Sequence, residues 1–226
     1  MNKRKTIIGI LIITAISIAI MSIVDAIINP GYMYKSAIKI IMFLFIPLIS
    51  IFCDSNINLK DIFKVKSKKK LIISTILGLL VYLIILGAYL ILKKYIDLDS
   101  IKNILAENLK VNKNNFILVA LYISFINSLL EEFFFRGFIF LNLKKLIAIK
   151  SAYIISAFAF TVYHIGIMGS WFSPLIFLLA MVGLFAGGII FNYLNESNSN
   201  IYSSWLVHMM ANFAINTVGF IMFDII

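Results

Sequence analysis

Residues 116–140 read FILVALYISFINSLLEEFFFRGFIF. The segment is long enough to cross a bilayer as a helix, which takes about 20 apolar residues. It nevertheless carries three ionisable side chains, Glu131, Glu132 and Arg136. Each such group at membrane depth costs about 2.5–3.5 kcal/mol, so it persists where it pairs, lines a cavity or takes part in chemistry. The segment therefore predicts a membrane-embedded fold with a polar site inside it.

The composition of the whole chain agrees with a membrane protein. Its 226 residues are 62% hydrophobic and 13% charged, whereas a soluble domain has roughly 45–50% apolar and about 25% charged residues. A soluble globular enzyme and a disordered chain are both excluded. The single cysteine, Cys53, excludes an internal disulfide framework and a cysteine-based zinc site.

We expect an all-α fold, a polytopic transmembrane helical bundle of about seven spans. The first apolar run is longer than the core of a signal peptide and no cleavage site follows it, so we interpret it as a span. The mixed-charge stretch 93–115 predicts, in part, an interfacial helix. We expect residues 1–115 to form N-terminal helices and loops and residues 116–226 a catalytic core, within a single integrated membrane domain. The predicted spans are residues 7–28, 37–53, 71–92, 116–140, 152–168, 173–194 and 201–226.

The distribution of basic residues predicts the orientation. The loops on the N-terminal side carry twelve Lys and Arg residues, and the segments on the other side carry seven, Lys35 and Lys39 among them. Cytoplasmic loops are rich in basic residues, so the N-terminus is expected in the cytoplasm. The net charge of +10 is attributed to these loops, and the expected partner is the lipid bilayer rather than nucleic acid. Splitting or merging one span would reverse the assignment upstream of it.

Two further predicted spans carry polar residues, with His164 in one and His208 and Asn212 in the other. Glu131 is rotated about 100° from its neighbour Glu132 on a helix, so it can point elsewhere. At 1.5 Å per residue, Glu131, His164 and His208 lie roughly 14, 18 and 11 Å below the inner boundary of the membrane. Three ionisable groups on three helices at one depth predict a single polar chamber.

Each polar group also has a plainer interpretation. Glu132 and Arg136 stand four residues apart and can form a structural intrahelical pair. His164 alone could be a hydrogen-bonded core histidine, and His208 with Asn212 could join helices by hydrogen bonds. Together, the groups favour a functional cluster.

The cluster has the groups needed to hydrolyse a peptide bond without a serine or cysteine nucleophile. A carboxylate beside an imidazole can activate water as general base, and a second imidazole with a carboxamide can stabilise an oxyanion. Alternatively, Glu131, His164 and His208 could hold zinc, although no HExxH motif requires it, so no cofactor is favoured. A transporter is disfavoured because the outer half offers only Asp25 and Asp224 near span ends.

Three motifs resemble those of a known family. Residues 131–136 fit EExxxR, residues 160–164 fit FxxxH and residues 208–212 fit HxxxN. In order and spacing they are similar to the motifs of the CAAX protease and bacteriocin-processing (CPBP) family of intramembrane proteases, which includes type II CAAX prenyl endopeptidases. The resemblance covers about residues 116–220. Gly183 and Gly187 also resemble the family's small-residue helix, where glycines allow close helix contact.

The resemblance implies an endopeptidase that works within the bilayer on a membrane-associated protein or peptide. It implies that Glu131 and His164 activate water and that His208 and Asn212 form the oxyanion site. Members are described both as metalloproteases and as glutamic proteases; we favour water activation without a tightly bound metal. A non-catalytic bacteriocin-immunity or peptide-binding protein is the alternative, and the short chain favours a bacterial plasma membrane. The supporting residues implied by the motifs are Glu132, Arg136 and Phe160.

Overall fold

The computed structural model describes residues 3–60 and 62–226. Residues 1–2 and residue 61, which the predicted cytoplasmic loops include, lie outside the described residues. The described chain is helical and contains no β-strand. Seven of its helices are long and apolar enough to cross a membrane, which confirms the predicted all-α bundle of seven spans. These helices are Lys3–Ile28, Tyr32–Cys53, Lys68–Tyr95, Phe116–Leu143, Ile149–Met168, Pro174–Asn198 and Tyr202–Met222.

The first two spans form a hairpin around a turn at residues 29–31. Asn29 has φ 44° and ψ 57°, a left-handed conformation that ends the first helix, and Gly31, with a φ of 82°, precedes the second. The second span begins at Tyr32, five residues before its predicted start, so Lys35 lies inside the helix together with Lys39. The hairpin consists of α1 (Lys3–Ile23), η1 (Val24–Ile28), α2 (Tyr32–Ile40), η2 (Ile41–Phe45) and α3 (Ile46–Cys53), the η segments being turns of π-helix.

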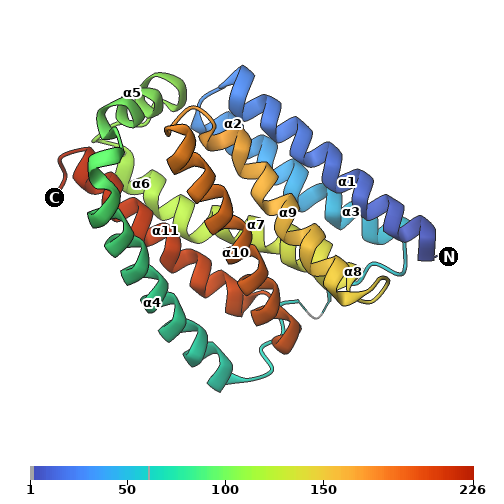
Figure 1. The fold of residues 1–226 in the computed structure, drawn as a ribbon. Helices are drawn as coiled ribbons and strands as arrows, with labels where there is room; N and C mark the ends of the chain where they lie inside the picture. The colour runs from blue at the N-terminus through green and yellow to red at the C-terminus, as the bar shows by residue number, and fades with distance from the viewer. Residues whose placement is uncertain (1–2, 61) are drawn as a thin grey trace.

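A third span and a short helix follow the basic loop. α4 (Lys68–Leu92) runs into a 3₁₀ turn, η3 (Lys93–Tyr95). The Asp97 side chain then caps α5 (Leu98–Leu109) by accepting a hydrogen bond from the Ser100 amide at 3.0 Å. A helix is thus present in the mixed-charge stretch, and it lies across one end of the bundle, away from the N-terminus (Figure 1).

One long helix carries the acidic pair, and three further spans complete the bundle. The stretch Phe116–Leu143 is helical throughout and alternates α and π turns. Its elements are α6 (Phe116–Leu121), η4 (Tyr122–Asn127), α7 (Ser128–Glu131), η5 (Glu132–Phe140) and α8 (Leu141–Leu143), followed by α9 (Ile149–Met168), α10 (Pro174–Asn198) and α11 (Tyr202–Met222).

The acidic helix occupies the middle of the bundle (Figure 1). It packs against α9 through η5 and against α11 through η4 and α7. On one side α9 contacts α1, and on the other α11 runs along α4. The three helices that carry ionisable residues are therefore neighbours.

The predicted close helix contact at Gly183 and Gly187 is wrong. A Cβ at either position would meet no atom within 4 Å. The next residue, Gly188, is turned toward α9, and a Cβ there would lie 3.0 Å from the Ala157 Cα. A shift of one residue along a helix rotates the side chain by about 100°, so the motif identified the right helix and the wrong face.

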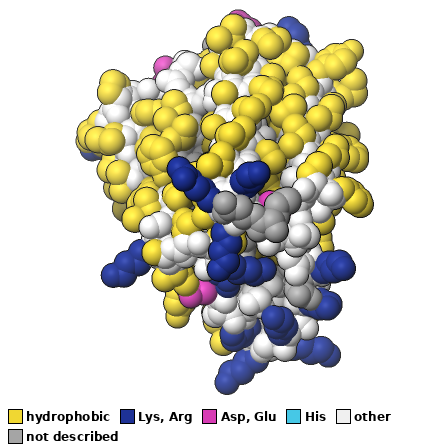
Figure 2. Space-filling model, turned by 90° about the vertical axis from the view of Figure 1, so that its right-hand side faces the viewer, with side chains coloured by type: hydrophobic (Ala, Val, Ile, Leu, Met, Phe, Trp, Pro, Cys, Tyr) yellow, Lys and Arg dark blue, Asp and Glu magenta, His cyan; other side chains and the backbone are white. Residues whose placement is uncertain are grey.

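The surface of the bundle is apolar, as a lipid-facing surface should be. Large apolar side chains are exposed on several spans, for example Phe52, Ile91 and Leu118. Figure 2 shows hydrophobic side chains over most of one face, with Lys and Arg gathered in its lower half. The protein is therefore a multi-pass membrane protein.

Candidate active site

The three ionisable residues predicted at one depth meet in the middle of the bundle. His164 on α9 places Nε2 at 3.9 Å from the Glu131 Oε2, and His208 on α11 places Nε2 at 3.6 Å from the same oxygen. The Glu131 side chain is 2% exposed. Both distances exceed a direct hydrogen bond and suit a bridging water. Their predicted convergence is confirmed.

The hydrogen bonds of the two histidines fix how each ring is used. The His164 Nδ1 lies 2.8 Å from the Phe160 carbonyl oxygen, one turn earlier on α9. A carbonyl only accepts, so Nδ1 donates and the Nε2 of the neutral ring is free to take a proton from the direction of Glu131. The Phe160 ring also lies edge-on to His164 at 4.5 Å. Phe160 therefore orients the second-motif histidine.

Glu132 belongs to a separate buried network. Its Oε1 accepts from the Arg136 Nη1 at 2.9 Å and lies 2.9 Å from the His208 Nδ1, while its Oε2 accepts from the Ser204 hydroxyl. The predicted pair with Arg136 is present and fully buried. The Arg136 guanidinium lies 4.2 Å from the centre of the Phe160 ring. Glu132 therefore holds His208, so adjacent glutamates contact opposite nitrogens of one imidazole ring.

A lysine from the N-terminal hairpin completes the site. The Lys39 Nζ donates to the Glu131 Oε1 at 2.7 Å and also to the Asn127 Oδ1. The Asn127 Nδ2 donates to the same Glu131 oxygen at 2.9 Å. The expectation that Lys39 counts with the segments outside the membrane is therefore wrong.

Lys39 is held within the bundle by aromatic rings as well as by the carboxylate. Its side chain is 5% exposed, and its Nζ lies 4.8 Å from the centre of the Tyr163 ring. A lysine inside an apolar run is itself a signal of a partner. That signal was lost because the predicted span began at Ala37, beside the lysine.

The Asn212 amide, expected at the oxyanion site, contacts a backbone carbonyl of the acidic helix. Its Nδ2 donates to the Ile123 carbonyl oxygen of η4 at 3.2 Å. In the described part of the chain its amide thus joins α11 to the acidic helix. Asn216, one turn further on, makes the same kind of contact with the Ala120 carbonyl at 3.1 Å.

The residues named for a zinc site fit a metal only in part. Glu131 and both histidines converge, and each imidazole Nδ1 has an oriented partner, as in many metal sites. However, the Lys39 ammonium already lies against the Glu131 carboxylate. Among the described residues, no group of three or more His, Cys, Asp or Glu side chains is arranged to hold a metal ion.

Comparison with known proteins agrees with the motifs. Residues 113–214 match a family model described as Type II CAAX prenyl endopeptidase Rce1-like. The searches of curated proteins and of solved structures gave no match. The matched region contains all three motifs and the convergent Glu131, His164 and His208. The resemblance to the CPBP family is therefore confirmed for residues 113–214, which are similar to Rce1-like type II CAAX prenyl endopeptidases.

Proposed function

We propose that this protein is an intramembrane endopeptidase in which Glu131 and His164 activate water to hydrolyse a peptide bond. The observation that carries the proposal is the convergence of two imidazole Nε2 atoms on the Glu131 Oε2 inside a buried chamber. A carboxylate and an imidazole at water-bridged distance form a general acid–base pair. The substrate is a membrane-associated protein or peptide, in line with the family to which residues 113–214 belong.

The two oxygens of Glu131 would have different roles. Lys39 and Asn127 hold Oε1 by hydrogen bonds of 2.7 and 2.9 Å. Oε2 faces the histidines and takes the proton of the attacking water. The water oxygen then bonds to the scissile carbonyl carbon. As the C–N bond breaks, that proton passes by way of His164 to the leaving nitrogen.

The developing oxyanion needs a donor on the other side of the scissile carbonyl. In its imidazolium form, His208 donates from Nδ1 to Glu132 and from Nε2 into the chamber. Asn212 lies one turn further along α11 and joins His208 in this role when its amide turns from the Ile123 carbonyl. Such donors aimed at developing charge are worth about 10²–10³ in rate.

The test uses protein reconstituted in liposomes with two substrates, a prenylated CAAX peptide and a mixture of unlipidated peptides analysed by mass spectrometry. Glu131→Gln keeps the shape of the side chain and removes the base, so cleavage should fall about 10²–10⁴-fold. The matched control is Glu107→Gln on α5, an exposed position that should leave cleavage unchanged. Cleavage by the Glu131→Gln variant at the wild-type rate would disprove the mechanism.

The same assay addresses the metal and the non-catalytic alternative. We propose that no tightly bound metal is required, so a membrane-permeable chelator should leave the rate unchanged. Loss of activity that only zinc restores would assign Glu131, His164 and His208 as metal ligands.

The non-catalytic alternative makes a different prediction. If the wild-type protein cleaves neither substrate, and if the wild type and the Glu131→Ala variant bind a bacteriocin-type peptide equally well, the protein is an immunity or peptide-binding protein.

We further propose that the protein lies in a bacterial plasma membrane with its N-terminus in the cytoplasm. This orientation rests on the excess of basic residues in the loops on the N-terminal side.

A further inference from the structure

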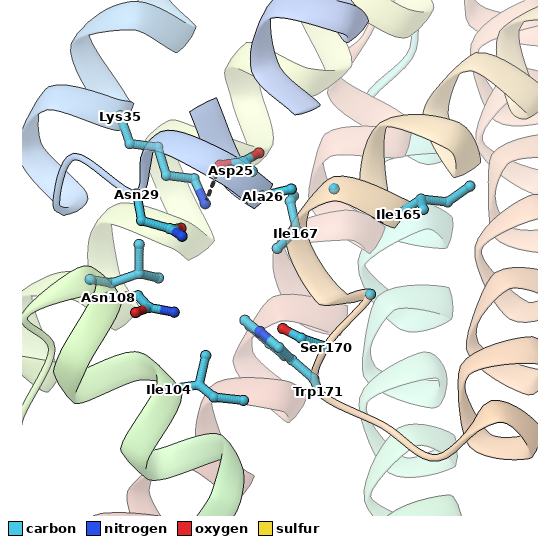
Figure 3. A pocket seen from close by; sticks show the side chains of 13 residues that line it. Asp25, Ala26, Asn29, Lys35, Ile104, Asn108, Ile165, Ile167, Ser170 and Trp171 are labelled. Carbon is cyan, nitrogen blue, oxygen red and sulfur yellow. Dashed lines mark ion pairs between the residues drawn. The ribbon is translucent and has the colours of Figure 1, made fainter. Parts of the chain in front are cut away.

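A polar pocket lies at the end of the bundle that α5 crosses. Its volume is about 320 Å³, and it is bounded by the turn after η1, by α2, by α5 and by the turn after α9. Figure 3 shows side chains from all four segments around it. Its polar lining consists of Asp25, Asn29, Lys35, Asn108, Ser170 and Trp171.

The inner wall of the pocket is a buried ion pair that retains unused hydrogen-bonding capacity. The Lys35 Nζ lies 2.5 Å from the Asp25 Oδ1, and the two side chains are 11% and 0% exposed. The second carboxylate oxygen, Oδ2, is buried and has no hydrogen-bond partner among the described residues. A buried carboxylate oxygen is normally paired, either with protein or with ordered water.

From this ion pair, α2 leads directly to the active site. Lys35 and Lys39 are four residues apart on α2, so they share a helix face and are separated by about 6 Å. Lys39 contacts Glu131. From the sequence we expect only Asp25 and Asp224 as polar groups in this half of the membrane, whereas the structure adds Lys35 and Lys39.

Tyrosines lie beside the lysines of both ion pairs: Tyr32 stands one turn before Lys35 on α2, and Tyr163 packs against Lys39. The Tyr32 and Tyr122 rings meet edge to face at 5.6 Å, and the Tyr163 ring lies 4.8 Å from the Lys39 Nζ. The hydroxyls of Tyr122 and Tyr163 are buried without a hydrogen-bond partner among the described residues. Buried polar groups with spare capacity, next to a roomy polar cavity, are where internal water binds.

On the other side of the site, the protein supplies the partners itself. Both carboxylate oxygens of Glu132 are occupied, by Arg136, His208 and Ser204. The Asn195 amide in turn donates to the Ser204 hydroxyl at 2.6 Å. On this side the Arg136 Nε and Nη2 are buried without a hydrogen-bond partner among the described residues, so the oxygen atoms that lack a partner near Glu131, the Tyr122 and Tyr163 hydroxyls and the Asp25 Oδ2, belong to the other side of the site.

We propose that the water consumed in hydrolysis is drawn from the pocket below α5 and reaches Glu131 along the face of α2 that carries Lys35 and Lys39. The inference rests on the proposed function, because each bond cleaved consumes one water at a carboxylate that is 2% exposed. Apolar side chains surround the site on the lipid side, so resupply needs a polar path.

Hydroxyl-radical footprinting in detergent tests the path without reference to catalysis, since radicals made from water modify side chains beside it. Tyr163 is 0% exposed but lies on the proposed path, so it should be modified. Phe138 is also 0% exposed and belongs to the same apolar core, and it should stay protected. Ala26→Trp places an indole in the pocket and should protect Tyr163. Ile27→Trp, at the next residue with a 74% exposed side chain, should not.

The catalytic arm uses the same two variants in the peptide assay. Ala26→Trp should lower kcat about tenfold with little change in KM, because water supply becomes limiting, while Ile27→Trp should match the wild type. The proposal is overturned if Tyr163 is as protected as Phe138, or if Ala26→Trp leaves either the footprint or kcat unchanged. If the wild type modifies Tyr163 but cleaves no peptide, the proposed function fails while the water path stands.

Discussion

The two carboxylate oxygens of Glu131 have different surroundings. One oxygen is fixed by Lys39 and Asn127, and the other faces His164 and His208. The fixed oxygen forms an ion pair with the buried Lys39. Because the ammonium compensates its charge, the carboxylate stays ionised in an apolar bundle. The free oxygen can then act as a base without losing its orientation.

The Lys39–Glu131 pair should be strongly coupled in stability. Lys39→Met strands the Glu131 carboxylate in the core and should cost about 3–5 kcal/mol of unfolding free energy. In a Glu131→Gln background, Lys39→Met should cost much less unfolding free energy, because no buried carboxylate is left without its counter-ion. Thermal unfolding of the four proteins in one detergent gives the coupling energy. Additive effects would mean that the two side chains do not interact.

Asn212 can be separated from a purely structural residue by comparison with Asn216. Under the proposed mechanism, Asn212→Ala should lower kcat about 10²-fold with KM little changed. Asn216→Ala removes bonds to the Ala120 carbonyl and the Ser124 hydroxyl and should lower thermal stability more than kcat. An Asn212→Ala protein that is destabilised but retains its kcat would leave Asn212 as a link between helices.

At the scale of elements, the position of α9 sets the position of His164. Gly166, two residues later, faces α1, and a Cβ there would lie 2.9 Å from the Ser22 Cα. The neighbour is backbone, so it cannot move aside without shifting a helix. The α1–α9 contact therefore helps to set the distance between His164 and Glu131.

Gly166→Ala should push α1 and α9 apart. We expect a loss of about 1–3 kcal/mol in unfolding free energy, the usual cost of overpacking, together with lower proteolysis because His164 moves with its helix. Gly87→Ala in α4 is the control, since a Cβ there meets no atom within 4 Å, and alanine favours a helix by up to about 1 kcal/mol. Equal stability of the two variants would rule out the close approach.

The elements that could be predicted from sequence are those that composition alone determines. Long apolar runs predicted all seven spans, and ionisable residues within those runs identified Glu131, His164 and His208. The start of the second span was missed because Lys35 and Lys39 read as loop residues until their partners are known. Their partners, Asp25 and Glu131, lie on other helices, and one sequence does not reveal such pairing. The contact of Asn212 with a backbone carbonyl was equally invisible.

At the scale of the whole molecule, the region that carries the motifs is not self-contained. The matched residues 113–214 hold the motifs, but the counter-ion of the central carboxylate comes from α2. The expected division at residue 116 therefore separates two parts of one site. Residues 1–115 contribute to the site itself as well as to the bundle.

The proposed orientation can be checked with the native cysteine. Cys53 is exposed at the end of the second span, so it should lie on the cytoplasmic side with the N-terminus. A membrane-impermeant maleimide should label it in inside-out vesicles and not in intact cells. Ser170→Cys with Cys53→Ser, placed between α9 and α10, should show the reverse. The opposite pair of results would invert the topology.

The long-range pairing of Lys39 has a consequence for biosynthesis. Lys39 precedes Glu131 by 92 positions, so at about 5–20 residues per second the ribosome delivers the ammonium to the membrane several seconds before its carboxylate. During that interval the nascent hairpin carries an uncompensated cation, which can snorkel to the headgroups on its flexible stem. The arrival of the fourth span would draw the lysine inward, so the chemistry of the site is assembled as a late event of insertion.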